Sequence, residues 1–245
     1  GLADFHHHRA VDDANILAEI YFCMVEKMRK FELNTFADMT REVKANADPL
    51  KLKPYHLIIL VKNKTGLKNL YRLVSESYVT YYKRFPRIPR SLIERHREGL
   101  IIGSACEAGE LYRSILDKKS NDEIQDIASF YDYLEIQPLC NNAFMLRDGT
   151  VQSEEELKEF NRTIVRLGEE VGKPVCATGD VHFLDPDDEI YRHILLAAKK
   201  FDDADKSMPI YFKTTDEMLE DIVSVSPGTF VDGGILFDDI MNFGE

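Results

Sequence analysis

Four residues with side chains that can bind a divalent metal lie at or just after expected strands: His56, Cys106, Asp180 and His182. Parallel α/β folds place their functional residues at the carboxyl ends of the strands. His, Cys and Asp together suit Zn²⁺, and His with Asp also suits Mn²⁺ or Fe²⁺. The positions of these residues therefore predict that they converge on one metal site.

The pair Asp180 and His182 is the most informative part of this set. In an extended chain, two residues that lie two positions apart point to the same side. The other two members have plain structural alternatives. His56 can be a histidine that merely ends a strand, and Cys106 can be a small buried residue.

A second group of residues that could do chemistry lies near the start of the chain, in the segment His6–Ala14. Asp12 and Asp13 are expected in the first turn of a helix, where the helix dipole favours a carboxylate. His8 lies five residues before Asp13, in the preceding loop. Such an Asp could hold a divalent metal while the His takes a proton from water. The alternative is an Asp that caps the helix beside solvated histidines.

The elements that position these residues divide the chain into two unequal parts. A helix is expected at 12–30, where apolar residues recur at helical spacing, and a short helix is expected at 36–44. From Tyr55 onward, apolar runs of strand length alternate with helical patterns. Strands are expected at 56–61, 100–103, 133–137 and 175–178. Helices are expected at 65–74, 108–117, 121–130, 153–171, 187–199 and 216–222.

This alternation predicts an α/β fold in which the four strands are parallel neighbours in a barrel-like sheet. Ser153 is expected to cap the helix at 153–171, with Glu156 completing a capping box. The stretch 223–245 has no clear helical or strand period, so we assign it no structure.

The totals of the chain limit the class of protein. Its 245 residues are 44% hydrophobic and 30% charged, as in soluble globular proteins, and no apolar run is long enough to span a bilayer. Four cysteines without CxxC spacing indicate a reducing cytoplasm. A net charge of -12 argues against a stand-alone nucleic-acid binder. The first residues resemble neither a translation start nor a signal peptide, so we expect a chain entered in mid-gene.

Several segments resemble known families. The segment 8–14 resembles the last motif of DnaQ-like (DEDDh) 3′–5′ exonucleases. The segments 54–63, 98–111 and 176–186 resemble later motifs of the PHP (polymerase and histidinol phosphatase) domain. An exonuclease that ends directly before a PHP segment is similar to the alpha subunit of PolC-type DNA polymerase III. Segments 133–138 and 155–161 also resemble that family, and the resemblance covers about residues 1–222.

The resemblance implies roles for particular residues. His8 matches the general base of the exonuclease, and Asp13 matches its last metal-binding carboxylate, with Mg or Mn as the metal. His56, Cys106, Asp180 and His182 match positions of PHP metal ligands, with Zn or Mn as the metal. The implied fold is an incomplete PHP-type (β/α) barrel, preceded by the terminal helix of an exonuclease domain.

The resemblance also implies a domain organisation. Residues 1–33 are expected to be the C-terminal remnant of the exonuclease, 34–54 a connector, 55–222 the C-terminal part of the PHP domain, and 223–245 an atypical tail. The other exonuclease carboxylates and the early PHP motifs are expected before Gly1, and the polymerase domains after Glu245.

The implied function is part of a replicative DNA polymerase with a proofreading exonuclease. Its partners would be DNA, dNTP, the sliding clamp and other replisome subunits, with no membrane partner. Because so many active-site groups are expected elsewhere, we expect this segment to be inactive on its own. Two alternatives remain: a stand-alone PHP-type metal-dependent phosphoesterase, and a PHP platform that is structural rather than catalytic.

Overall fold

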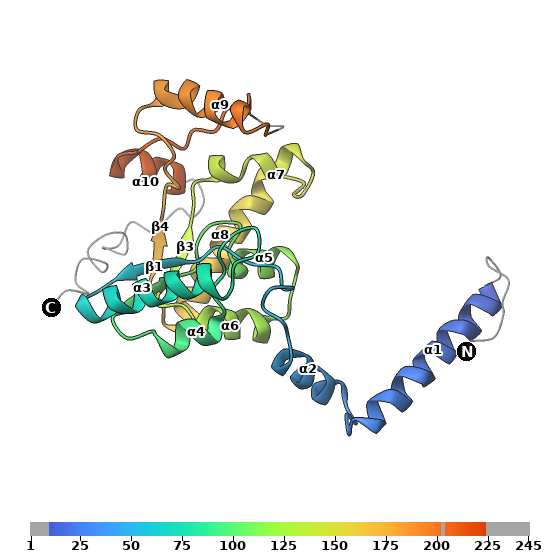
Figure 1. Ribbon diagram of the computed structural model, residues 1–245. Helices are drawn as coiled ribbons and strands as arrows, with labels where there is room; N and C mark the ends of the chain where they lie inside the picture. Colours follow the sequence, from blue (N-terminus) through green and yellow to red (C-terminus); the bar gives the residue numbers. More distant parts are fainter. Residues whose placement is uncertain (1–9, 202–203, 224–245) are drawn as a thin grey trace. The chain divides into compact units, whose positions relative to one another are not determined.

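The computed structural model describes residues 10–201 and 204–223, and its internal contacts divide the chain into two units, Gly1–Lys53 and Pro54–Glu245 (Figure 1). The described elements are mixed helices and short strands, in agreement with the expected α/β class. The stretch expected to be an atypical tail, 223–245, lies outside the described residues apart from its first residue. Among the described residues, no helix combines the length and the apolar character that crossing a bilayer requires.

In the first unit, the described residues form helices α1 (Ala10–Lys30) and α2 (Phe36–Ala45). Both lie where the sequence predicts them. Thr35 caps α2, because its hydroxyl accepts a hydrogen bond from the backbone N–H of Asp38 and the Asp38 carboxylate accepts one in return. Several apolar side chains of α1 are exposed, including those of Leu17 and Met24. Helical spacing therefore predicts the helix correctly, although these apolar positions are not buried.

The second unit contains the strands and the remaining helices. Its strands are β1 (Ile58–Val61), β2 (Leu100–Gly103), β3 (Leu134–Ile136) and β4 (Val175–Ala177). Its α-helices are α3 (Lys64–Val79), α4 (Arg90–Arg95), α5 (Glu110–Leu116), α6 (Asn121–Ser129), α7 (Phe144–Arg147), α8 (Glu154–Val171), α9 (Glu189–Ala198) and α10 (Thr215–Val223). Two 3₁₀ turns, η1 (Leu139–Asn142) and η2 (Pro186–Asp188), precede α7 and α9.

The strands form two pairs of opposite type. β3 and β4 are parallel, with Leu134 opposite Val175. β1 and β2 are antiparallel, with Val61 opposite Leu100. A single parallel bridge between Gly103 and Tyr133 joins the end of β2 to the start of β3.

The expectation that all four strands are parallel neighbours is therefore wrong for β1. The connection between β1 and β2 contains two helices, α3 and α4, so the chain leaves the end of β1 and returns to that same end. The backbone N–H of Lys62 donates to the carbonyl of Gly99 at 2.9 Å, which holds the start of β2 beside the end of β1. Between β3 and β4, the long helix α8 crosses back once, as a parallel pair requires.

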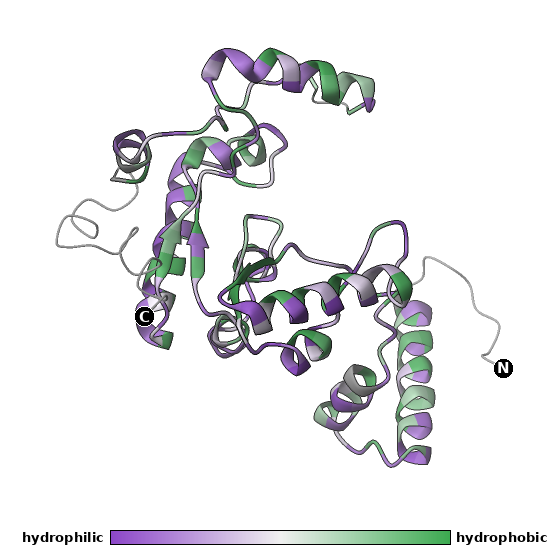
Figure 2. Cartoon of the chain, turned by 60° about the vertical axis from the view of Figure 1, so that its left-hand side comes forward, coloured by the Kyte–Doolittle hydropathy of each residue, from purple (hydrophilic) through white to green (hydrophobic). Residues whose placement is uncertain are grey.

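The core of the second unit lies between the strands and α8. The buried apolar residues of α8 recur at helical spacing: Leu157, Phe160, Ile164 and Leu167. Ile102 of β2 and Leu134 of β3 belong to the same core and are fully buried. Figure 2 shows hydrophobic and hydrophilic residues following one another along the helices, as expected for helices with one apolar face.

Both ends of α8 have a local cause. The Ser153 hydroxyl accepts a hydrogen bond from the backbone N–H of Glu156, as the sequence predicts. The Glu156 carboxylate, however, accepts from the backbone N–H of Gln152 rather than from that of Ser153, so the expected capping box is only half formed. Gly172 ends the helix with a φ of 66°, a conformation that favours glycine.

Candidate functional site

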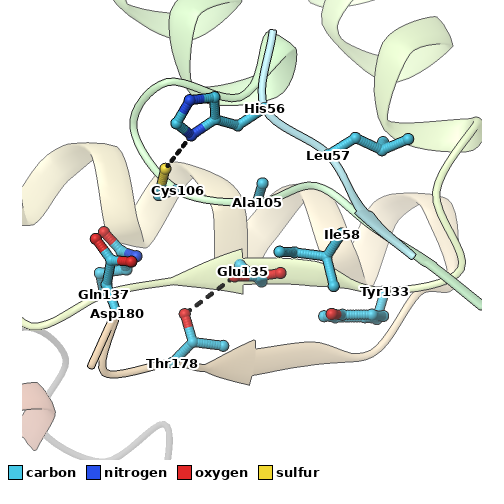
Figure 3. A pocket seen from close by; sticks show the side chains of 10 residues that line it. All are labelled: His56, Leu57, Ile58, Ala105, Cys106, Tyr133, Glu135, Gln137, Thr178 and Asp180. Atoms are coloured by element: carbon cyan, nitrogen blue, oxygen red, sulfur yellow. Dashed lines mark hydrogen bonds between the residues drawn. The ribbon is translucent and has the colours of Figure 1, made fainter. Parts of the chain in front are cut away.

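A pocket of about 420 Å³ lies between the strands of the second unit (Figure 3). Its lining side chains come from the ends of all four strands. They are His56, Leu57, Ile58, Ala105, Cys106, Tyr133, Glu135, Gln137, Thr178 and Asp180. Three of the four residues predicted to converge on a metal, His56, Cys106 and Asp180, therefore line one pocket.

His56 and Cys106 are in direct contact. The Nδ1 atom of His56 lies 3.3 Å from the Sγ atom of Cys106. The backbone supports this contact, because the N–H of His56 donates to the carbonyl of Ala108 at 3.1 Å and His56 forms a parallel bridge with Gly109. His56 thus lies just before β1, beside the loop that follows β2.

Burial, together with the negative charges of Glu107 and Asp180, raises the pKa of the Cys106 thiol to about 12. The thiol is therefore protonated at neutral pH. A metal bound by this sulfur would have to displace the proton, because the thiolate is the form that binds metals. Negative charge from Asp180 opposes a bare thiolate and favours a cation in the same pocket.

Glu135 is a buried carboxylate that points into the pocket beside Thr178 (Figure 3). Burial raises its pKa, while a hydrogen bond from Thr178 Oγ1 to Glu135 Oε2, 3.0 Å long, lowers it. Among the described residues, Glu135 Oε1 and Gln137 Oε1 are buried without a hydrogen-bond partner. Buried oxygens without a partner are costly, so these two atoms are candidates for contact with a bound cation or water.

Sequence reasoning missed Glu135, Gln137 and Thr178 as pocket residues. One signal was present, because polar Glu135 and Gln137 alternate with apolar residues along β3. Residues two apart on a strand face the same side, so this alternation places Tyr133, Glu135 and Gln137 together. The missing information was which side of β3 faces a cavity rather than the core.

Asp180 and His182 do not act as an extended pair. Asp180 has a φ of 49°, in the left-handed region, so the chain turns at this residue. The Nδ1 atom of His182 lies 2.7 Å from the carbonyl oxygen of Asp180, and the ring lines a different cavity together with residues of α9. The side chains of Asp180 and His182 are therefore not on one side, and the extended geometry predicted for them is wrong.

Comparison with known proteins identifies the family. The PHP domain family matches residues 9–138, which is more than half of the chain. The chain belongs to the PHP domain family.

Three similar proteins carry the name "DNA polymerase III PolC-type". The protein of Clostridium perfringens is 51% identical over 222 residues, which cover 90% of this chain and 15% of that protein. The protein of Thermotoga maritima is 43% identical over 225 residues, which cover 92% of this chain and 16% of that protein. The protein of Bacillus subtilis is 42% identical over 217 residues, which cover 87% of this chain and 15% of that protein. This PHP chain thus spans about 15% of the length of these relatives.

The described part of the PHP chain offers metal-binding side chains that are not gathered into a complete set of ligands. Within the described ranges, no group of three or more His, Cys, Asp or Glu side chains is arranged so that it could hold a metal ion. The contact between His56 and Cys106 supplies two donors, and Asp180 and the unpartnered oxygen of Glu135 line the same pocket. A metal held by this chain alone would therefore require these side chains to move together.

The exonuclease residues predicted from the sequence lie in the first unit. Asp13 is in the first turn of α1, close to the predicted start of the helix, and its side chain is exposed. His8 lies outside the described residues. The structure therefore supports the helical context of Asp13 and leaves the pairing of Asp13 with His8 as a prediction.

Proposed function

We propose that this chain is a segment of a PolC-type replicative DNA polymerase, which performs DNA-templated DNA synthesis and removes misincorporated nucleotides by 3′–5′ exonuclease action. The observation that carries the proposal is the 51% identity to the Clostridium perfringens protein over 90% of the chain. Identity at this level extends through both units rather than over a single motif. The longer protein would act on DNA and dNTP together with a sliding clamp and other replisome subunits.

The pocket of the second unit is proposed as part of the metal site of the PHP domain. His56, Cys106, Asp180 and His182 would bind Zn or Mn, completed by residues elsewhere in the longer protein. The contact between His56 and Cys106 supports this role, because imidazole and thiolate together are typical of Zn²⁺ sites. His182 can join only if the turn at Asp180 changes, since its ring lines another cavity.

The start of the chain is proposed as the end of the exonuclease domain, at 1–33, with the connector at 34–54 and the PHP part at 55–222. His8 would be the general base that activates water, and Asp13 would hold Mg or Mn. A two-metal mechanism needs several carboxylates around both ions, so this chain alone should lack exonuclease and polymerase activity.

Extension of a primed template with dNTP tests this proposal. The full-length protein that carries this sequence should extend the primer and degrade an unpaired 3′ end, and the 245-residue chain should do neither. A full-length protein with His8→Ala should still extend the primer but lose 3′ degradation. The proposal fails if the full-length protein does not extend the primer, or if the 245-residue chain releases nucleotides in a His8-dependent manner.

A further inference from the structure

The segment 62–97 is strongly basic within an acidic chain. It carries ten Lys or Arg residues and two Asp or Glu residues. The whole chain, in contrast, carries 31 Lys or Arg residues and 43 Asp or Glu residues. The segment comprises α3, α4 and the loop that connects them. The net charge of the chain therefore hides a local surface that can attract a polyanion.

The outer face of α3 interleaves basic and aromatic side chains. Lys64, Lys68 and Arg72 follow one another at intervals of four residues, which places them along one side of the helix. Tyr71 and Tyr78 lie beside them and are 63% and 59% exposed. The opposite face of the helix is buried, so these side chains face solvent because of the way α3 packs.

A groove of about 670 Å³ lies between α3 and α4. Its lining combines aromatic rings with cationic side chains. The lining residues are Tyr71, Arg72, Ser75, Glu76, Tyr81, Leu92, Arg95 and His96. The carboxylate of Glu76 accepts a hydrogen bond from Thr80 Oγ1 at 2.7 Å, which offsets part of its negative character in the groove.

The loop after α3 adds a second set of rings and charges. The rings of Tyr78 and Tyr82 stack with centroids 6.1 Å apart and planes 20° apart, and both side chains are exposed. Lys83 and Phe85 form an antiparallel bridge around Arg84, which has a φ of 66°. A non-glycine residue in this conformation costs free energy, and such strain is more frequent at functional positions. The turn holds an exposed arginine at its tip.

We propose that the α3–α4 surface, formed by α3, the loop 80–89 and α4, binds single-stranded DNA. Phosphates would lie against Lys68, Arg72 and Arg84, and unpaired bases would stack on Tyr71 and Tyr78. Surfaces that bind single strands combine a basic track with aromatic stacking platforms in this way. Duplex DNA would leave the tyrosines unused, because its bases are already stacked and paired.

The choice of DNA rests on the proposed function, whereas the preference for a single strand rests on the surface itself. A proofreading polymerase must handle an unpaired 3′ strand, so a single-strand surface has a use in such a protein. An acidic polypeptide is the other polyanion that the charge would attract. Stacking distinguishes the two, because carboxylates gain nothing from the ring faces of tyrosines.

Fluorescence anisotropy of a labelled 16-nucleotide oligo(dT) with the 245-residue chain tests the proposal. Affinity should fall as salt rises, with a slope of about -0.7 in log–log form for each phosphate contacted. The double variant Lys68→Ala/Arg72→Ala should reduce the magnitude of that slope by about 1.4. Tyr78→Ala should weaken binding about tenfold without changing the slope, and Tyr78→Phe should retain binding.

Two matched variants away from this surface serve as controls. Lys118→Ala/Lys119→Ala removes two exposed basic side chains after α5, and Tyr191→Ala removes an exposed ring from α9. Both should bind oligo(dT) as the unaltered chain does. Arg84→Gly removes a charge while suiting the left-handed backbone, so it should weaken binding and leave the melting temperature unchanged or higher.

Several results would overturn the proposal. Absence of binding at 50 mM salt would do so, as would equal binding by the α3 variants and the controls. Preference for duplex DNA or for oligo(rU) would reject single-stranded DNA as the ligand. Competition by polyglutamate together with insensitivity to Tyr78→Ala would identify an acidic polypeptide instead. This assay involves no polymerisation, so its outcome is independent of the primer-extension test. A failure of oligo(dT) binding rejects the single-strand surface, whereas a failure of primer extension rejects the proposed function.

Discussion

The Nδ1 atom of His56 lies 3.3 Å from the Sγ atom of Cys106, although 50 sequence positions separate the two residues. The contact joins the segment before β1 to the loop after β2. It also places the half-buried thiol beside carboxylates, and both the partial burial and these negative charges raise the pKa of the thiol. The protonation of Cys106 therefore depends on the burial and the charges of the surrounding pocket.

We expect Cys106 to react slowly with iodoacetamide. With a pKa of about 12, about one thiol in ten thousand is ionised at pH 8, and the thiolate is the reactive form. The reaction rate should rise about tenfold for each pH unit between pH 7 and 9. Peptide mass spectrometry of the alkylated 245-residue chain would measure it, with exposed Cys23 as the internal reference. Equal labelling of Cys23 and Cys106 at pH 8 would contradict this environment.

Replacement of Glu135 with Gln should stabilise the fold at pH 8. Burial raises the carboxyl pKa in the folded state, so the folded protein binds that proton more tightly than the unfolded chain does. The wild type therefore loses stability, relative to Glu135→Gln, as pH rises above about 4.5 through the folded-state pKa. The gain in the free energy of unfolding should be larger at pH 8 than at pH 5.

Urea unfolding of the 245-residue chain at the two pH values measures this difference. Glu169→Gln, which alters an exposed carboxyl on α8, is the matched control and should show little change at either pH. If Glu135→Gln gives the same change at pH 5 and pH 8, the carboxyl does not carry the raised pKa in the folded protein.

Leu134→Ala should destabilise the second unit by about 2–5 kcal/mol. Leu134 is fully buried in β3, and truncation there removes apolar contacts and leaves a cavity. Leu184→Ala is the matched control, because that side chain is 65% exposed and its loss should change stability by less than about 0.5 kcal/mol. Urea unfolding at neutral pH measures both, and a similar cost for both variants would contradict the position of the core.

Local features of this fold could be predicted because neighbouring residues determine them. Ser153 and Gly172 mark the two ends of α8, because Ser153 supplies a capping oxygen and Gly172 tolerates a positive φ. The apolar runs correctly indicated β2 in full and the other strands to within two residues at either end. These signals do not depend on where the rest of the chain lies.

Features that depend on distant contacts could not be predicted. The direction of β1 relative to β2 depends on how α3 and α4 return the chain, which no local pattern states. The left-handed turn at Asp180 separates its side chain from that of His182, although the sequence favoured an extended pair. His56, Cys106 and Asp180 line one pocket, and their role as metal ligands stays a prediction. Glu135 was missed because its burial depends on the assembled sheet.

Asp180 should matter more for metal retention than His182, whose ring lies outside the pocket. Asp180 lines the pocket that contains His56 and Cys106, whereas the ring of His182 lines another cavity. Even residues that only support a metal ligand change affinity by about 10–100-fold, so loss of a ligand should cost at least about tenfold. In the full-length protein, Asp180→Ala should therefore lower the Zn or Mn content before it affects primer extension.

Elemental analysis of purified full-length variants measures the metal content directly. Asp187→Ala is the matched control, because it removes an exposed carboxylate from η2, near the same loop, and should leave metal content unchanged. If the turn at Asp180 stays as observed, His182→Ala should keep the metal content of the Asp187→Ala control, because the ring of His182 then lines a different cavity. Equal metal content in Asp180→Ala and the unaltered protein would remove Asp180 from the ligand set. A loss in His182→Ala as large as that in Asp180→Ala would show that the turn opens when metal binds, which brings both side chains to one ion.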